Sequence, residues 1–396
     1  MTDAKYTTIK NGALAVSGDK IAWIGRTDEL NKEISDLADQ VIDCRGKWIL
    51  PGFVDCHTHL IWAGSRSTEF EMRLAGKTYE QIASQGGGIF STVNAVRKAS
   101  QTQLFDTAAK RVQYFLTQGI TCVEIKSGYG LDLKNELKML AVARRLGREL
   151  PVHVEPTFLG AHALPPEFSG RSDDYVDLVT ETMLPCVKDQ NIATAVDVFC
   201  ETIAFSKDQT RTLFSKARDL GFRVKLHAEQ LSDNKGAQLA SEFEALSCDH
   251  LEYLSLDGVR AMARKNVVAV LLPGAFYMLK ETQTPPIDLL RQYGVPMALA
   301  TDLNPGTSPV FSMAPVINMG CLLFGMTCEE AVARATINGA KALGLDSKKG
   351  SLEIGKDADL VVWDIDSPAD LAYLIGRAPV NMVAVSGKIE YKAKSC

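Results

Sequence analysis

The sequence predicts an α/β protein: a TIM-like (β/α)8 barrel over residues 51–344, with a small β domain built from residues 1–50 and 345–396. Two observations predict this fold. Eight short β-rich runs alternate with amphipathic segments through the middle of the chain, which is typical of a parallel barrel. Both flanks instead contain short alternating strands broken by Gly-Asp and Arg-Gly turns, and neither flank is large enough to bury a core alone.

The elements follow one another in a regular order. The predicted barrel strands are residues 52–59, 120–127, 151–159, 195–202, 222–228, 245–250, 266–272 and 296–302. The segments between them, such as residues 132–150 and 207–221, carry apolar residues three and four apart and a glycine near the end, which predicts helices. The flanking strands fall within residues 8–50 and 351–392, and they predict a single β domain beside the barrel.

Composition and charge exclude several classes of protein. Of the 396 residues, 46% are hydrophobic and 23% charged, which is typical of a soluble globular protein. A net charge of -5 without a long basic run argues against binding to nucleic acid or to an anionic membrane. The nine cysteines show no C-x-x-C spacing, and no apolar run is long enough for a membrane helix. We therefore expect a cytoplasmic protein with reduced thiols.

The six histidines are unevenly placed. Side chains two residues apart in a strand face the same way, so Asp55, His57 and His59 share one face of the first strand. The remaining polar residues at the carboxyl-terminal ends of predicted strands, or just past them, are His162, His227, His250 and Asp302; only His153 falls at the opposite end. Barrel enzymes build their active sites at this rim, so five of the six histidines are predicted there.

This cluster predicts a metal site. An H-x-H pair alone is a modest signal, and Asp302 alone could simply open the turn "LNPG". Three imidazoles and a carboxylate together suit zinc or iron, with one position left for water. Hydrolysis is the chemistry that follows, because a bound metal lowers the pKa of water from about 15.7 toward roughly 7.

Several motifs carry a resemblance to a known family. The segments "PGFVDCHTHL", "LHAEQ", "DHLEYL" and "ATDLNPG", on predicted strands one, five, six and eight, resemble the amidohydrolase superfamily. The segments "RLAGKTYEQIASQGGGIFSTV", "EIKSGYGLD", "FLGAHALPPE" and "ATDLNPGTSP" are similar to one branch of it. That branch hydrolyses a C–N bond of a five-membered cyclic amide, 4-imidazolone-5-propanoate, in histidine catabolism. The resemblance covers nearly the whole chain.

The resemblance implies roles for named residues. His57, His59, His227 and Asp302 would hold one zinc or iron ion, and Asp302 and His250 would act in catalysis. The residues that would bind the substrate are Arg66, Tyr129, His162, Gln230, Asn304, Gly306 and Thr307. A single ion is expected because strand four, "VDVFCET", lacks the lysine that bridges two metals in many superfamily members. We expect a homodimer that acts on a small molecule.

Two alternatives stay open. An aminohydrolase that releases ammonia from another heterocycle would use the same scaffold, although Gln230 stands where such enzymes usually have glutamate. A non-catalytic assembly protein would have lost ligands that are all present in this chain. The stretch "QGGGIFST", residues 85–92, lacks the lysine of a phosphate-binding loop and is predicted to be a loop that closes over the substrate.

Overall fold

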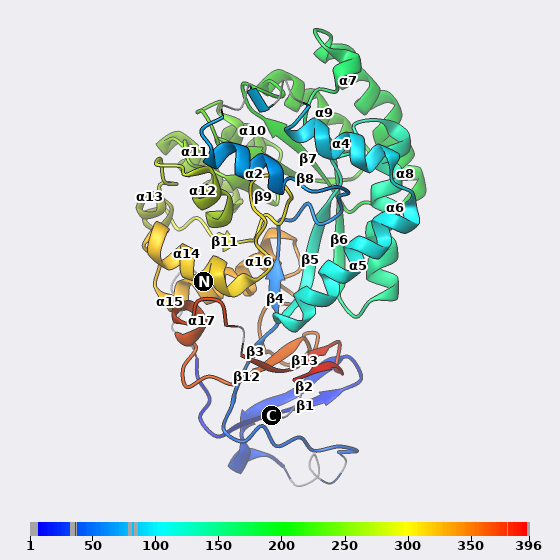
Figure 1. Cartoon of the computed structure of the whole chain (residues 1–396). Helices are drawn as coiled ribbons and strands as arrows, with labels where there is room; N and C mark the ends of the chain where they lie inside the picture. Colours follow the sequence, from blue (N-terminus) through cyan, green and yellow to red (C-terminus); the bar gives the residue numbers. More distant parts are fainter. Residues whose placement is uncertain are drawn as a thin grey trace.

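A computed structural model describes residues 7–31, 36, 38–77, 81–82, 86–377 and 379–393. Eight parallel strands form a sheet in the order β11-β10-β9-β8-β7-β6-β5-β4, and the helices surround it (Figure 1). The small β sheets lie together at one end of the barrel, where the early and late parts of the chain meet (Figure 1). This arrangement confirms the predicted fold class.

The barrel strands fall inside the predicted runs, except that β6 continues two residues past its run, to Ala161. They are β4 (Phe53–Asp55), β5 (Ile120–Lys126), β6 (His153–Ala161), β7 (Ala195–Cys200), β8 (Arg223–Ala228), β9 (Ser247–His250), β10 (Val268–Leu271) and β11 (Met297–Leu299). The first strand is shorter than predicted, because regular pairing with β5 ends at Asp55. His57 and His59 therefore follow β4 rather than forming part of it.

The ring closes through residues just past β4 and β11. The Asp302 amide donates to the His57 carbonyl at 3.0 Å, and the His59 amide donates to the Leu303 carbonyl at 3.0 Å. A parallel bridge between Thr58 and Leu303 lies between these two bonds. The three candidate ligands His57, His59 and Asp302 are thus fixed by the backbone bonds that complete the barrel.

Helices connect the strands on the outside. They are α2 (Ser67–Leu74), α4 (Ile89–Lys98) and α5 (Gln101–Thr117) after β4; α6 (Leu133–Glu149) after β5; η2 (Pro166–Phe168), α7 (Ser172–Leu178), η3 (Val179–Met183) and α8 (Leu184–Gln190) after β6; α9 (Lys207–Asp219), α10 (Gly236–Glu242) and α11 (Leu256–Lys265) after β7, β8 and β9; α12 (Pro273–Leu279) and α13 (Ile287–Gln292) after β10; and α14 (Met313–Phe324), α15 (Cys328–Arg334) and α16 (Ile337–Ala342) after β11.

Helix α9 shows why these segments begin where they do. The Ser206 hydroxyl accepts the Gln209 amide at 3.2 Å, and the Gln209 side chain accepts the Ser206 amide at 2.9 Å. This reciprocal capping box satisfies two backbone donors.

One predicted loop is wrong in part. Helix α4 begins at Ile89, directly after Gly88, so residues 89–92 are helical rather than a loop. The reason is the apolar spacing that follows, because Val93 and Val96 are buried and draw this segment onto the barrel. Residue 85 lies outside the described residues.

The small β domain draws strands from both flanks. Strand β3 (Trp48–Pro51) pairs antiparallel with β12 (Leu360–Trp363). On its other side β12 pairs antiparallel with β13 (Val380–Val385), which in turn pairs with β14 (Lys388–Lys392). A separate hairpin joins β1 (Gly12–Ser17) and β2 (Lys20–Arg26); η1 (Thr27–Glu29) and α17 (Asp370–Tyr373) complete the elements. Trp363 is fully buried and packs on Phe53 with ring centroids 5.3 Å apart, which ties this sheet to the barrel.

Candidate metal centre and active site

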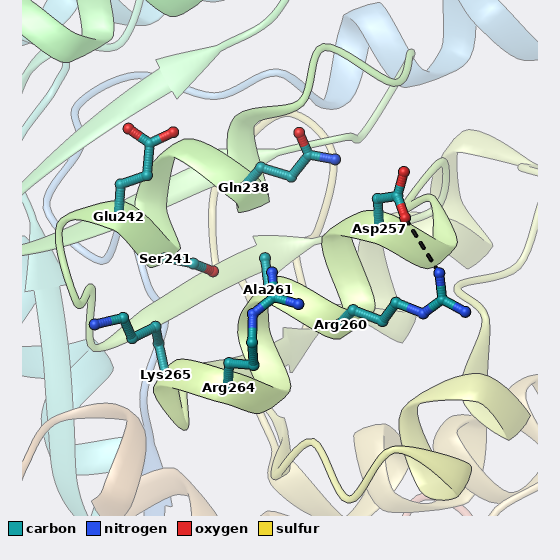
Figure 2. A pocket seen from close by; sticks show the side chains of 8 residues that line it. All are labelled: Gln238, Ser241, Glu242, Asp257, Arg260, Ala261, Arg264 and Lys265. Atoms are coloured by element: carbon teal, nitrogen blue, oxygen red, sulfur yellow. Dashed lines mark hydrogen bonds and ion pairs between the residues drawn. The ribbon is translucent and has the colours of Figure 1, made fainter.

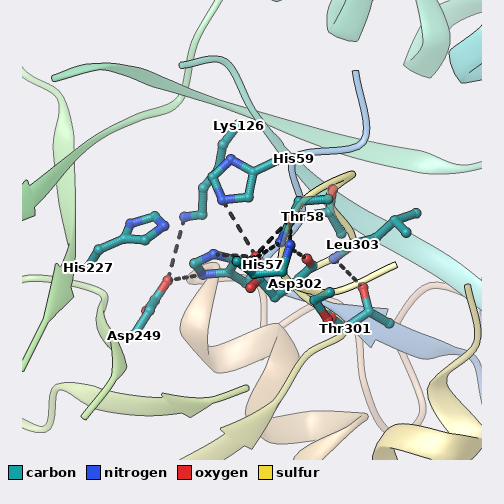
Figure 3. Close-up of polar contacts among 12 residues, drawn as sticks. His57, Thr58, His59, Lys126, His227, Asp249, Thr301, Asp302 and Leu303 are labelled. Atoms are coloured by element: carbon teal, nitrogen blue, oxygen red, sulfur yellow. Dashed lines mark hydrogen bonds and ion pairs between the residues drawn. The ribbon is translucent and has the colours of Figure 1, made fainter. Parts of the chain in front are cut away.

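His57, His59 and Asp302 meet at the point of barrel closure. The Nε2 atoms of His57 and His59 lie 3.4 and 3.6 Å from Asp302 Oδ1 (Figure 3). All three side chains are buried, with 0 to 4% of their surface exposed. A ligand atom from each lies within 4.8 Å of the other two, which is close enough to share one ion.

His227 and His250 complete the cluster from neighbouring strands. His227 lies in β8, and His250 is the last residue of β9. Their rings lie 4.6 and 5.9 Å from the ring of His57, and nitrogens of the three histidines lie within 4.8 Å of one another. The cluster therefore contains every predicted ligand, but His250, predicted as a catalytic residue outside the ligand set, is also within ligand range.

The state of these nitrogens fits a cation. Five of them, His57 Nε2, His59 Nδ1, His227 Nδ1, His227 Nε2 and His250 Nδ1, are buried without a hydrogen-bond partner. Burial, together with neighbouring positive groups, holds the pKa of His57, His59 and His250 well below the usual range. These imidazoles are thus neutral, as metal ligands must be. A cation beside Asp302 would supply the partner that His57 Nε2 lacks, since an unpaired buried polar atom is costly.

Two buried carboxylates lie behind the ligand histidines. Asp249 Oδ2 accepts from His57 Nδ1 at 2.6 Å, and Asp197 Oδ2 lies 3.0 Å from His227 Nδ1. The bond to Asp249 fixes which ring nitrogen of His57 carries the proton and leaves the other free to bind metal. The Lys126 ammonium lies 3.5 Å from Asp249 (Figure 3). It also lies 2.7 Å from Asp197, and so links the two carboxylates.

This network extends deeper into the barrel. Glu124 lies 2.9 Å from the ammonium of Lys126 and 2.8 Å from that of Lys225, and all three side chains are fully buried. Burial alone would lower the pKa of Lys126, but Asp197, Glu124 and Asp249 together raise it above its ordinary value. Sequence reasoning missed this network. The available signal was the alternation of charged residues inside apolar strands, as in the pair Glu124 and Lys126.

His162 and Tyr129 form a wall beside the cluster. The His162 ring stacks on His59, with centroids 4.9 Å apart, and its Nδ1 lies 3.0 Å from the Gly128 carbonyl. Burial lowers the pKa of His162 to about 3, so it is neutral. Burial and then the charge of Asp302 raise the pKa of Tyr129, whereas Arg66 lowers it. The structure thus places these predicted residues against the histidine cluster.

Comparison with known proteins identifies the family. Residues 48–389 match the model of the Amidohydrolase family. Curated imidazolonepropionases from Shewanella sp. (strain ANA-3) and Pseudomonas entomophila are each 54% identical to this chain; the alignments cover 98% and 95% of this chain and 95% and 93% of theirs. The chain belongs to the amidohydrolase family. Within that family it groups with the imidazolonepropionases, and it is a hydrolase.

Solved structures of similar fold are more distant. A 5-methylcytosine deaminase from Klebsiella pneumoniae superposes with a TM-score of 0.74 at 15% identity, covering 96% of this chain and 94% of its own. An adenosine deaminase from Xanthomonas campestris with bound zinc gives a TM-score of 0.70 at 19% identity, covering 96% and 88%. At these identities the likeness shows only the fold. The family and the histidine–aspartate cluster together indicate a divalent metal in this amidohydrolase.

The predicted substrate residue Arg66 is already paired. Its Nε and Nη2 atoms donate to Glu69 Oε2 at 2.9 and 2.7 Å, so one edge of the guanidinium fork is occupied. Its Nη1 lies against Gly306, where a Cβ atom would stand only 2.1 Å away. Sequence reasoning placed Arg66 among the substrate-binding residues and missed its partner Glu69. Residue spacing gave a signal, because positions i and i+3 lie on one helix face.

The loop after β11 is organised by its own side chains. Asn304 Oδ1 accepts the Gly306 and Thr307 amides at 2.8 and 2.7 Å, and Asn304 Nδ2 donates to the Asp302 carbonyl at 2.8 Å. The side-chain amide of Asn304 is therefore used inside the loop. Gln230 is half-buried just after β8.

Two further acidic residues, Glu229 and Asp55, accept hydrogen bonds from other parts of the fold. Glu229 adopts a left-handed backbone conformation with φ of 49°, and its carboxylate accepts the Gly236 and Ala237 amides at the start of α10. It thereby caps this helix. Asp55, predicted to share a face with the histidines, accepts from the Thr301 hydroxyl at 2.6 Å and from the Thr301 amide at 3.0 Å.

A hollow of about 310 Å³ on the outer surface, between α10 and α11, has a different character (Figure 2). Its cations Arg260 and Lys265 lie 3.5 Å from Asp257 and 2.9 Å from Glu244. No histidine lines it.

Among the described residues, no helix is long and apolar enough to cross a membrane, and the eight described cysteines are free.

Proposed function

We propose that this amidohydrolase hydrolyses 4-imidazolone-5-propanoate to N-formimidoyl-L-glutamate. One observation carries the proposal. The neutral side chains of His162 and Tyr129, and the guanidinium of Arg66, lie near a buried cluster of four candidate ligands: His57, His59, His227 and Asp302. The relatives named imidazolonepropionase support the same reaction through 54% identity over nearly the full length. The proposal includes one zinc or iron ion per chain, a homodimer and a cytoplasmic location.

Under this proposal the four ligands His57, His59, His227 and Asp302 hold the ion. A bound divalent ion lowers the pKa of water toward about 7 and polarises a carbonyl oxygen. In the reaction, the oxygen of one water forms a bond to the ring carbonyl carbon, and the C–N bond of the ring breaks. Asp302 accepts the proton of the attacking water and returns it to the leaving ring nitrogen.

The geometry supports Asp302 in this role. Its Oδ1 faces the Nε2 atoms of both His57 and His59. We assign to His250, whose Nδ1 lacks a partner, the polarisation of the carbonyl oxygen.

The remaining residues position the substrate. His162, stacked on His59 and neutral, and the half-buried Gln230 would hold the ring. Arg66 and Tyr129 would hold the propionate beside the 304–307 loop, because Arg66 Nη1 packs against Gly306 of that loop. Because Glu69 occupies the Nε edge of Arg66, the substrate carboxylate would use Nη1 and the free hydrogen of Nη2.

The experiment supplies 4-imidazolone-5-propanoate to metal-loaded protein and follows loss of ring absorbance together with ammonia. We expect ring opening without ammonia release. Ammonia released from cytosine-like or guanine-like heterocycles, with the imidazolone untouched, would instead identify an aminohydrolase. Asp302→Asn is the matched negative control, since the substitution preserves shape but removes the proton acceptor.

A further inference from the structure

Two guanidinium groups converge on Gly306. Arg66 Nη1 packs directly over this glycine, and Arg73 Nη2 donates to its carbonyl oxygen at 3.2 Å. Arg66 and Arg73 are seven residues apart, at the start and in the last turn of α2. Residues two helical turns apart lie on one face, so α2 presents both cations to the loop after β11.

The charges of Arg66, Arg73 and Glu69 do not sum to zero. Glu69 neutralises Arg66, and its Oε2 also accepts the Gly88 amide at 3.1 Å. Among the described residues, no carboxylate lies within 4.0 Å of the Arg73 guanidinium. Two guanidinium groups and one carboxylate therefore leave one positive charge beside Gly306.

The excess charge is partly shielded from water. Burial, followed by the nearby charge of Arg66, lowers the pKa of Arg73, whereas Glu69 raises it. Only 17% of the Arg66 side chain is exposed. Two like charges in such a setting are stabilised by an anion bound between them.

The same group is connected to the metal centre. Asn304 fixes the Gly306 amide and bonds to the Asp302 carbonyl, so the loop that receives both arginines begins at a candidate ligand. Burial and then the charge of Asp302 raise the pKa of Tyr129 and Arg66 lowers it, so Tyr129 lies near both the cluster and Arg66.

We propose that Arg73 is the second cation of a carboxylate-binding site, formed with the Nη1 side of Arg66, and that it determines specificity for ring substrates bearing a carboxylate arm. The inference rests on the proposed function in placing the ring at the histidine cluster. Glu69 holds Arg66 and Gly88 in place, and it leaves the site with one net positive charge, which one substrate carboxylate would balance.

The kinetic test compares Arg73→Gln with Lys98→Gln, which removes an exposed positive charge at the end of α4. With 4-imidazolone-5-propanoate, Arg73→Gln should raise KM about tenfold, equivalent to about 1.4 kcal/mol, and change kcat less than about twofold. Arg73→Lys should recover part of the loss, because it keeps the charge but not the fork. Lys98→Gln should change neither constant by more than about twofold.

A binding test separates this inference from the proposed reaction. Calorimetry of metal-loaded protein with 3-(imidazol-4-yl)propanoate and with its carboxamide should show tighter binding of the acid. Arg73→Gln should reduce that preference about fivefold or more and leave the carboxamide affinity unchanged, with a melting temperature close to wild type. Arg73→Lys provides the same comparison if the glutamine variant does not fold.

The outcomes are distinct. An unchanged preference for the acid in a folded Arg73 variant overturns the role of Arg73, whatever the wild-type protein hydrolyses. An Arg73-dependent preference in a protein that leaves the imidazolone intact supports the carboxylate site and refutes the proposed function alone.

Discussion

Asp249 offers a sharp test of how the metal centre is oriented. Its carboxylate contacts His57 Nδ1 at 2.6 Å, and neither side chain is exposed. A charge-assisted hydrogen bond of this kind is worth roughly 1.5–3 kcal/mol. At about 1.4 kcal/mol per factor of ten, Asp249→Asn should weaken metal binding about 10- to 100-fold, the range usual for such supporting partners.

The assay is competition for zinc between the protein and a chelating indicator, with metal content checked by elemental analysis. Asp359→Asn is a matched control, because Asp359 is also buried and pairs with a lysine, Lys349, at 2.6 Å, but in the small β domain. We expect the control to lower the free energy of unfolding and leave metal affinity within about twofold of wild type. If Asp249→Asn holds zinc as tightly as wild type, the carboxylate does not orient His57 and the reasoning fails.

Three further substitutions test other parts of the site. His250→Ala should keep most of the metal and lower kcat more than it raises KM, as measured by steady-state kinetics and metal content; loss of the metal would make His250 a ligand, which its position also allows. Lys126→Met should lower the free energy of unfolding by about 3–5 kcal/mol in urea titrations, because buried carboxylates lose their partner; an unchanged midpoint would contradict the charge network. Arg66→Ala should lower kcat/KM about 10- to 100-fold, mainly through KM, and Arg66→Lys should recover only part; equal kinetics in all three proteins would remove Arg66 from the substrate site.

The fold was predictable because its signals are local. Each parallel strand is buried on both faces and reads as a short apolar run, and the capped helices between strands carry their own start signals. The end of β4 was not predictable in the same way. Its last predicted residues end the regular ladder with β5 and also pair with residues beyond β11, and that second pairing depends on partners almost 250 residues away.

The candidate site was likewise predictable only in part. The position of His57, His59, His227 and Asp302 at strand ends is visible in the sequence, because strand ends in a barrel share one rim. Their supporting contacts are long-range: the partner of His57 is 192 residues away in the chain. No periodicity pairs two such residues, so these partners emerge only from the three-dimensional arrangement.

The buried lysines also bear on the proposed number of metal ions. Strand four lacks a bridging lysine, but it contributes Asp197, whose carboxylate faces His227. That carboxylate is already contacted by the Lys126 ammonium at 2.7 Å, so a second divalent ion on this side would meet a fixed positive charge.

We therefore expect close to one ion per chain in protein saturated with zinc, measured by elemental analysis of desalted samples. Asp302→Asn should retain much of this metal, because three imidazoles remain, yet lose nearly all turnover, because the proton acceptor is gone. Two ions per chain would show that Lys126 moves aside when metal binds, and would contradict a one-ion centre.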